Sequence, residues 1–224
     1  MTRVKICGLM KHEDVNFCVQ AGVHMLGFVV EYPVYVPWNL KVRDARELIE
    51  QVPPFVSTCV VTGGEVKKIL DMVNKTCPDV VQLHYKETLK DVEEISKQLK
   101  PKGIKVIKAL RMDSMGNCDF EITDPVIAVR ELLKTGVSAI LVDSYTSSMP
   151  GGTGVAVDLS IFEAVKKEST VPVILAGGLN ADNISRVVQQ VNPYAVDVLT
   201  GVEDKPNQKN YEKIEKLIKN VLHI

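Results

Sequence analysis

Short runs of apolar and β-branched residues recur along this chain of 224 residues, and each run is continuously apolar rather than alternating with polar positions. Runs of this kind are typical of strands that are buried on both faces of a parallel sheet. The eight runs span residues 3–8, 25–30, 55–61, 80–84, 105–111, 139–143, 172–178 and 195–201. The stretches between them carry apolar residues at helical spacing, as residues 42–52 and 65–76 illustrate.

The alternation of expected strands and helices indicates the fold class. Such an order along a chain forms a parallel sheet, and eight units in this length predict an α/β fold with a single closed (β/α)8 TIM barrel. A doubly wound open sheet is the alternative, because one sequence does not show whether the first and last strands pair. No linker or low-complexity segment interrupts the chain, so we expect one domain over residues 1–224.

Composition limits the partners and the location that can be expected. Lys and Arg number 27 against 28 Asp and Glu, which gives a formal net charge of −1. So balanced a charge offers no general attraction to nucleic acid or to an anionic membrane, and no apolar run approaches the roughly 18 residues of a spanning helix. The first residues enter a strand-like run without a signal-peptide core, so we expect a cytoplasmic protein.

Cysteine and histidine positions argue against a metal site or a disulfide framework. The cysteines are odd in number and scattered, with no CxxC pair, and the four histidines lack metal-ligand spacing. We expect free thiols at Cys7, Cys18, Cys59, Cys77 and Cys118. A free cysteine is most often a small buried hydrophobe, so only its position can single one out.

Polar residues and glycines gather where the expected strands end, which is where barrels of this kind place their sites. The candidates are Cys7, Gln82, His84, Arg111, Asp143, Gly177, Gly178 and Gly201. A cysteine and a carboxylate at two strand ends can act as an acid–base pair. Gly177 and Gly178 precede an expected helix whose unpaired N–H groups suit a phosphate, and these barrels often hold one between their last two loops.

Each of these residues also has a purely structural explanation. Asp143 can cap the loop after the sixth strand, and His84 can be bonded to backbone at a strand end. Arg111 can be a surface charge, and the glycines can serve tight turns alone. The residue types by themselves leave both readings open.

Eight motifs, taken together, resemble one enzyme family. They are "VKICGL", "EDV", "AGVHMLGFV", "VQLH", "LVDS", "GGTG", "LAGGLNADNI" and "DVLTGVE", in this order over essentially the whole chain. The set is similar to phosphoribosylanthranilate isomerase, an enzyme of tryptophan biosynthesis. The resemblance implies a (β/α)8 barrel that performs an Amadori rearrangement of N-(5-phosphoribosyl)anthranilate, without metal or organic cofactor.

The resemblance also implies roles for particular residues. Cys7 corresponds to the general base of the family and Asp143 to its general acid. The substrate phosphate would lie on the backbone amides of Gly177, Gly178, Gly201 and Val202, with Gly154 nearby. Lys5 could lower the pKa of Cys7. Further candidate substrate contacts are Lys5, Gln82, His84 and Arg111.

Some positions depart from the family pattern. The family carries an arginine in the loop after the second strand, where it contacts the anthranilate carboxylate, whereas residues 31–39 here read "EYPVYVPWN". His84 is followed by Tyr85 instead of glycine, and Leu199 and Thr200 replace two serines. The expected acid–base pair and phosphate corner are therefore retained, while the wall that recognises the aromatic acid is rebuilt.

Three interpretations follow from these departures. In the first, Arg43 or Arg111 supplies the missing charge and the activity is unchanged. In the second, the pocket takes a different phosphorylated aminoaldose, against Tyr32, Tyr35 or Trp38. In the third, the barrel binds a phosphate ligand without catalysis, although a binding module has no need of the acid–base pair. In each case the expected partner is a phosphorylated small molecule, and the protein is a monomer or homodimer.

Overall fold

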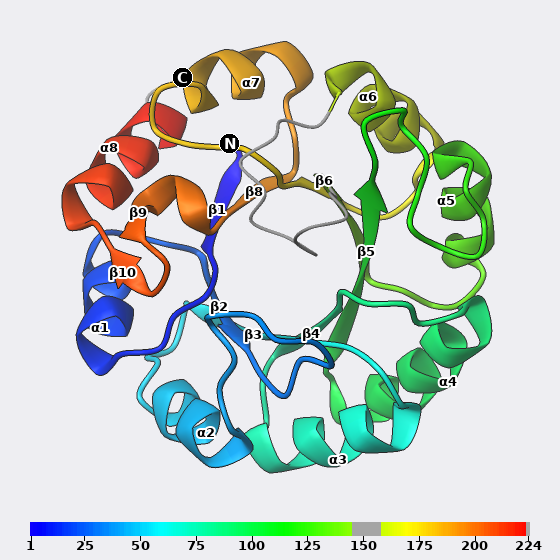
Figure 1. Ribbon diagram of the computed structural model, residues 1–224, viewed down its shortest axis with the longest axis horizontal. Coiled ribbons are helices and arrows are strands. Elements are labelled where there is room, and N and C mark those ends of the chain that lie inside the picture. The colour runs from blue at the N-terminus through cyan, green and yellow to red at the C-terminus, as the bar shows by residue number, and fades with distance from the viewer. Residues whose placement is uncertain (145–157, 223–224) are drawn as a thin grey trace.

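The computed structural model describes residues 1–144 and 158–222, in which a ring of helices surrounds a closed barrel of parallel strands (Figure 1). Neighbouring strands in the chain are neighbours in the barrel, from β1 to β8, and β8 pairs with β1. The strands are β1 (Arg3–Ile6), β2 (Met25–Val29), β3 (Ser57–Thr62), β4 (Val80–Leu83), β5 (Lys105–Met112), β6 (Ala139–Ser144), β7 (Val173–Leu175) and β8 (Ala195–Val198). The predicted (β/α)8 barrel is confirmed, and the open sheet is excluded.

The helices follow the strands and form the outer layer (Figure 1). They are α1 (His12–Gln20), α2 (Val42–Glu50), α3 (Val66–Thr76), α4 (Leu89–Leu99), α5 (Pro125–Leu133), α6 (Leu159–Glu168), α7 (Ile184–Val191) and α8 (Tyr211–Leu222). A short 3-10 helix, η1 (Lys100–Lys102), follows α4. After β8 the chain forms η2 (Thr200–Val202) and a small hairpin of β9 (Glu203–Lys205) and β10 (Gln208–Lys209), which the sequence pattern did not predict.

Closure of the barrel joins residues that are far apart in the sequence. β1 and β8 pair in parallel, and the register places Lys5 directly opposite Asp197. One residue beyond β1, the backbone N–H of Cys7 donates to the carbonyl oxygen of Val198 at 2.9 Å. The first and last strands therefore bring a cysteine, a lysine and an aspartate to one side of the barrel.

Side chains along each strand alternate between two hydrophobic cores. On β6, Ile140 and Val142 pack in the larger core between the strands and the helices, whereas Leu141 packs in the smaller core inside the barrel. Continuing this two-residue period places Asp143 on the inward face, just above the inner core. The continuous apolar runs thus conceal an alternation, because both faces of each strand are buried. At the strand ends, the residues whose side chains point into the barrel form the floor and walls of the site.

Helix ends follow the signals in the sequence where these are strong. Asp124 accepts hydrogen bonds from the backbone N–H groups of Val126 and Ile127, with Pro125 in the first turn of α5, as its sequence predicts. Thr88 and Asp91 form a reciprocal capping box at the start of α4. These caps orient the helices that follow the β4 and β5 ends of the barrel.

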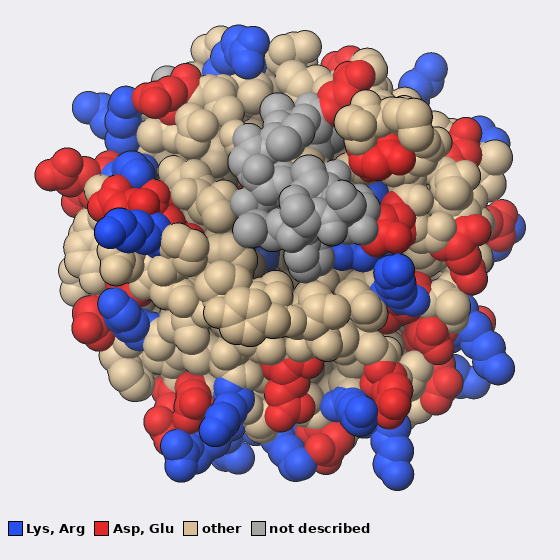
Figure 2. All heavy atoms as spheres, viewed as in Figure 1, with Lys and Arg blue, Asp and Glu red and all other residues tan. Residues whose placement is uncertain are grey.

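Charged side chains of both signs are interspersed around the edge of the face shown in Figure 2. No large area of one sign stands out on that face. Within residues 1–144 and 158–222, no helix combines the length and the apolar character needed to cross a bilayer.

The Thr88 cap gives a stability test. Thr88→Ala should lower the free energy of unfolding by about 1 kcal/mol, because the N–H of Asp91 loses its acceptor at 3.2 Å. Urea denaturation measures the change. Lys86→Ala is the matched control, since this exposed residue lies two positions earlier and outside the helix. An equal loss in the two variants would contradict a specific role of the cap.

Candidate active site

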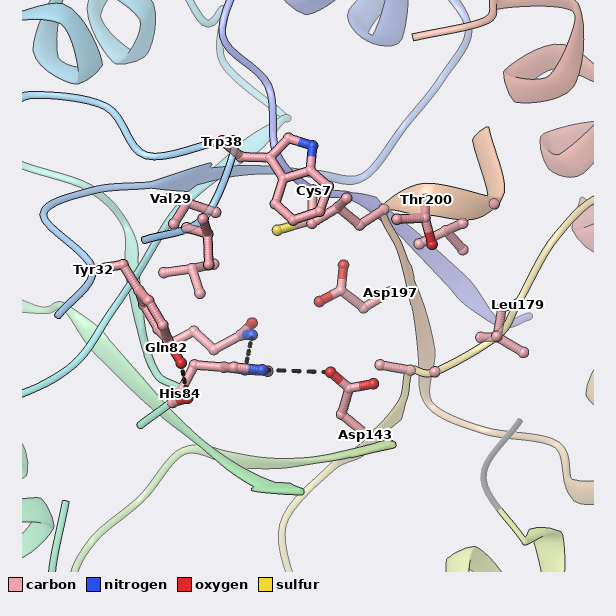
Figure 3. A pocket seen from close by; sticks show the side chains of 18 residues that line it. Cys7, Val29, Tyr32, Trp38, Gln82, His84, Asp143, Leu179, Asp197 and Thr200 are labelled. Atoms are coloured by element: carbon pink, nitrogen blue, oxygen red, sulfur yellow. Dashed lines mark hydrogen bonds and ion pairs between the residues drawn. The ribbon is translucent and has the colours of Figure 1, made fainter. Parts of the chain in front are cut away.

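A cavity with about 690 Å³ of empty space, part of it open to solvent, lies at the carboxyl ends of the strands (Figure 3). Its walls come from both ends of the chain and from the middle. The residues that line it are Cys7, Val29, Tyr32, Val36, Trp38, Val61, Gln82, His84, Asp143, Ala176, Gly177, Gly178, Leu179, Asp197, Val198, Leu199, Thr200 and Gly201. The predicted base, acid and glycines therefore face one space.

A polar layer beneath the cavity is organised by Lys5. Its ammonium donates to Oδ2 of Asp197 at 2.5 Å and to Oε1 of Gln82 at 3.0 Å. The lysine is only 2% exposed. Burial favours its neutral form, but Asp197, together with Cys7 and Cys59, outweighs that effect and raises the pKa of Lys5, so the side chain stays protonated. A buried ion pair thus crosses the β1–β8 seam.

Cys7 lies beside this ion pair at the end of β1. Burial raises the pKa of its thiol, while the positive charges of Lys5 and Lys209 oppose that shift. Cys7 is therefore mainly a neutral thiol in the free protein at neutral pH. The space for this thiol depends on a glycine, because a Cβ at Gly27 on β2 would lie 2.7 Å from the Cys7 sulfur.

A chain of polar contacts connects Lys5 to Asp143 across the cavity floor, and Figure 3 shows its part from Gln82 through His84 to Asp143. Because Oε1 of Gln82 accepts from a lysine, which has only donors, its amide nitrogen faces Nδ1 of His84 at 3.1 Å. In neutral His84, Nδ1 is then the acceptor and the ring proton is on Nε2. Nε2 lies 3.4 Å from Oδ2 of Asp143. The histidine is thereby held with its proton directed at the aspartate.

The glycines after β7 and β8 form a corner to which they contribute backbone alone. Gly177 and Gly178 have φ values of +85° and +63°, which favour glycine. A Cβ at Gly201 would lie 1.8 Å from the carbonyl oxygen of Leu179, so the loop after β8 packs directly on the loop after β7. Backbone of this kind can approach an anion closely.

The opposite wall of the cavity is apolar and comes from the loop after β2. Trp38 is 3% exposed, and its indole N–H donates to Oε1 of Glu203 at 2.9 Å. Lys209 donates to the same carboxylate oxygen at 2.9 Å and to the backbone carbonyl oxygen of Cys7 at 2.6 Å. Tyr32, on the same loop, donates its hydroxyl proton to the carbonyl oxygen of His84 at 2.7 Å. The hairpin after β8 therefore fixes the aromatic wall beside the thiol.

A second cluster of backbone amides, near the ends of β3 and β4, is already bonded to a side chain. The Glu87 carboxylate accepts from the N–H of Gly64 at 3.0 Å and from the N–H of Tyr85 at 3.1 Å. Lys108 donates to it at 2.8 Å, with both side chains of this pair at most 1% exposed. Burial lowers the pKa of Lys108, and the Glu87 charge opposes that effect.

Some predicted residues lie elsewhere. Arg111 is 2% exposed and pairs with Asp119, so it is not the surface charge that its structural explanation assumed, and it is absent from the cavity lining. Arg43 is 84% exposed and pairs with Asp44 on α2, so the expectation that it reaches the pocket is wrong. Tyr35 is 90% exposed and does not line the cavity.

Val202 and Gly154 are the two remaining residues predicted for the phosphate site. Val202 is fully buried and does not line the cavity, and its backbone N–H donates to the carbonyl oxygen of Leu199 at 3.4 Å. Gly154 lies outside the residues that the structure describes. Among the described residues, no group of three or more His, Cys, Asp or Glu side chains is placed to hold a metal ion, and all five cysteines are free thiols.

The sequence analysis missed Asp197 and the contact between Trp38 and Glu203. For Asp197 a signal was present, because this charged residue stands within the apolar run 195–201. It lies two positions after Ala195, which faces the inside of the barrel, so its side chain is expected on the same face. No comparable signal exists for the tryptophan, whose partner is 165 positions away.

The fold and this cavity define a (β/α)8-barrel protein with a small-molecule site at the carboxyl ends of its strands. Residues 4–220 match the family model of N-(5'-phosphoribosyl)anthranilate (PRA) isomerase. A relative of that name from Geobacter metallireducens is 38% identical over 98% of both chains, and one from Methanosarcina acetivorans is 32% identical over 98% of this chain and 93% of its own. The chain therefore belongs to the N-(5'-phosphoribosyl)anthranilate isomerase family.

Solved structures agree with this assignment. The isomerase from Thermotoga maritima superposes with a TM-score of 0.81 at 32% identity, over the full length of both chains. Another phosphoribosyl anthranilate isomerase, at 31% identity and a TM-score of 0.78 with full coverage of both chains, is a complex with reduced 1-(o-carboxyphenylamino)-1-deoxyribulose 5-phosphate. The Thermotoga maritima enzyme is also described as dimeric, in a structure of monomers generated from it.

The contact between the last two loops gives a second stability test. Gly201→Ala should destabilise the protein by about 2–3 kcal/mol, because the new methyl group overlaps the backbone of Leu179 and the two loops must separate. Gly22→Ala is the control, since its Cβ meets open space and only its φ of +82° adds strain of about 1 kcal/mol. Urea denaturation compares the two variants. A Gly201→Ala loss no larger than the Gly22→Ala loss would mean that the loops do not constrain each other.

Proposed function

We propose that this protein catalyses the Amadori rearrangement of N-(5-phosphoribosyl)anthranilate to 1-(2-carboxyphenylamino)-1-deoxyribulose 5-phosphate, a step of tryptophan biosynthesis. One observation carries the proposal: Cys7 and Asp143 line the same cavity from separate strands, next to a corner made of glycines. Family membership and the names of the relatives support the choice of substrate.

In the first step, protonated Asp143 donates to the ring oxygen of the ribose as the bond between C1 and that oxygen breaks. The nitrogen lone pair forms a C1=N bond, which gives an iminium ion. Nε2 of His84 lies 3.4 Å from Oδ2 of Asp143, next to the carboxyl group that donates the proton. The phosphate lies on the glycine corner, where amides supply donors without a lysine.

In the second step, the Cys7 thiolate removes the proton from C2, and the electron pair of that C–H bond neutralises the iminium nitrogen. This produces the enol form of the product, so the reaction is an internal redox change with no external electron carrier. Burial disfavours the thiolate in the free protein, whereas the positive iminium ion favours it when the substrate is bound. Proton exchange then returns both residues to their starting states.

The aromatic end of the substrate would lie against Trp38 and the neighbouring valines. This wall is apolar, and among the described residues that line the cavity none is Lys or Arg. That observation keeps a second candidate: the same chemistry on a phosphorylated aminoaldose whose aromatic group carries no carboxylate. Turnover of the aniline and anthranilate forms of the substrate distinguishes the two.

The roles of the acid and the base are tested by turnover. Cys7→Ser and Asp143→Asn should each reduce kcat by about 10²–10⁴-fold, because each removes one proton transfer, while affinity for the reduced product analogue changes little. Loss of anthranilate-type fluorescence follows the reaction. Val29→Ala, on the apolar wall, is the control that should affect KM more than kcat. Turnover close to that of the wild type in Cys7→Ser or Asp143→Asn would remove the role assigned to that residue.

The pH dependence of kcat/KM tests whether Lys5 lowers the pKa of Cys7. Its base form exists above its pKa, so activity should rise with pH, and Lys5 moves that rise to lower pH by favouring the thiolate. Lys5→Met removes this charge and leaves Asp197 unpaired, so the rise should move to higher pH by about one unit or more. Lys216→Met, on the exposed surface of α8, should leave the profile in place. An unchanged profile in Lys5→Met would contradict the coupling.

A further inference from the structure

Cys7 lies at the point where the chain leaves the barrel. β1 ends at Ile6, and Gly8, with a φ of +72°, turns the backbone away from the strand. The N–H of Cys7 still donates to the carbonyl oxygen of Val198 at 2.9 Å, as in a continued strand. Its carbonyl oxygen instead accepts from a side chain, the ammonium of Lys209 at 2.6 Å. The peptide groups on both sides of Cys7 are therefore anchored, one by β8 and the other by the hairpin that follows it.

Lys209 is itself held in one place. It pairs with Glu203 at 2.9 Å, and the side chains of the pair are 1% and 3% exposed. The same carboxylate accepts the indole N–H of Trp38. The indole packs on the turn after Cys7, because a Cβ at Gly8 would lie 2.9 Å from Cδ1 of Trp38. One carboxylate thus joins the lysine on the Cys7 carbonyl to the ring that covers the next residue.

Stability alone does not account for this buried pair. Taking two charges out of water is costly, and apolar side chains of similar volume are often at least as stabilising in such positions. A second lysine, Lys213, also binds the hairpin, through the backbone carbonyl oxygen of Glu203 at 2.8 Å, from a partly exposed position. Lys209 differs from Lys213 in its contact with the residue that bears the thiol. That contact is the feature that requires an explanation.

We propose that Lys209, paired with Glu203, is a positioning residue for the general base: it fixes the peptide carbonyl of Cys7 and so holds the sulfur where it can take the proton from C2 of the substrate. This deepens the proposed function and rests on it. Proton transfer requires the two groups within hydrogen-bond reach, and a misplacement of about 1 Å can reduce the rate about 100-fold. The turn at Gly8 has little stiffness of its own, so an anchor from outside the turn is needed to fix the thiol.

Two other roles of Lys209 make different predictions. A lysine that acts through its charge alone favours the Cys7 thiolate, in the same direction as Lys5, so its effect depends on the net charge that remains in the hairpin. A lysine that supports the hairpin alone is equivalent to Lys213, and replacing either one should then affect the reaction equally. The positioning role instead predicts a loss that follows the contact with Cys7.

Turnover of N-(5-phosphoribosyl)anthranilate by Lys209→Met tests the proposal. The variant should lose about 10- to 100-fold in kcat. KM should change little, because Glu203 still accepts the indole N–H of Trp38 and the walls of the cavity are retained. Lys213→Met is the matched control and should keep kcat near that of the wild type, since its ammonium binds the hairpin and not Cys7.

Lys209→Met leaves the Glu203 carboxylate buried without its cation, so the variant can fail to fold. The double variant Lys209→Met with Glu203→Gln removes both charges and keeps an oxygen acceptor for the indole N–H. It leaves the net charge of the hairpin as in the wild type, and its kcat should nevertheless be about 10- to 100-fold lower. Circular dichroism and urea denaturation show whether each variant is folded.

The outcomes separate these roles. A loss of kcat in the folded double variant, with Lys213→Met near the wild type, supports the positioning role. A double variant with kcat near that of the wild type would overturn it, because charge alone would then explain any loss in Lys209→Met. An equal loss in Lys213→Met would overturn it in favour of general support of the hairpin, and both of these results leave the isomerase assignment intact. A wild type that does not turn over N-(5-phosphoribosyl)anthranilate would overturn the proposed function and the positioning role together.

Discussion

Hydrogen bonds between β1 and β8 close the barrel, and the arrangement of the site depends on that closure. The register places Lys5 opposite Asp197 and ties the backbone of Cys7 to Val198. A shift of one residue would turn each inward side chain toward the helices. The Cys7 thiol, the Lys5–Asp197 ion pair and the loop after β8 are thus fixed relative to one another by backbone pairing between the first and last strands.

The sequence predicts the position of residues that stand at the end of their own strand. Cys7 and Asp143 each stand where a buried run ends, and in a barrel that position alone brings them to one face. Interactions between strands are harder to foresee. The chain from Lys5 through Gln82 to His84 depends on register and on side-chain direction, neither of which a single sequence displays. The two-residue spacing from Ala195 indicates that Asp197 points into the barrel, but this spacing is easily overlooked in a run that is otherwise continuously apolar.

The aromatic wall shows why the remainder of the site escaped prediction. Loss of an arginine in the loop after β2 suggested a substitute cation, and Arg43 was the nearest in sequence. It points to solvent, because its position on the exposed side of α2 decides its direction. What the loop does contribute is Trp38, held by Glu203 and Lys209 from the hairpin after β8. This contact joins the loop after β2 to the hairpin after β8. The two segments are far apart in the sequence, so no local pattern in the loop predicts the contact.

The Glu87 carboxylate decides which loop amides remain open to a ligand. It lies on amide groups of the loops after β3 and β4 in much the way that a ligand anion would lie on the glycines after β7 and β8. Glu87 is 2% exposed and does not line the cavity, so these amides are closed to any other anion. Of the two groups of loop amides among the described residues, only the glycine corner borders the cavity. The barrel therefore carries two similar groups of backbone donors, and a side chain of the protein itself removes one of them from contact with a ligand.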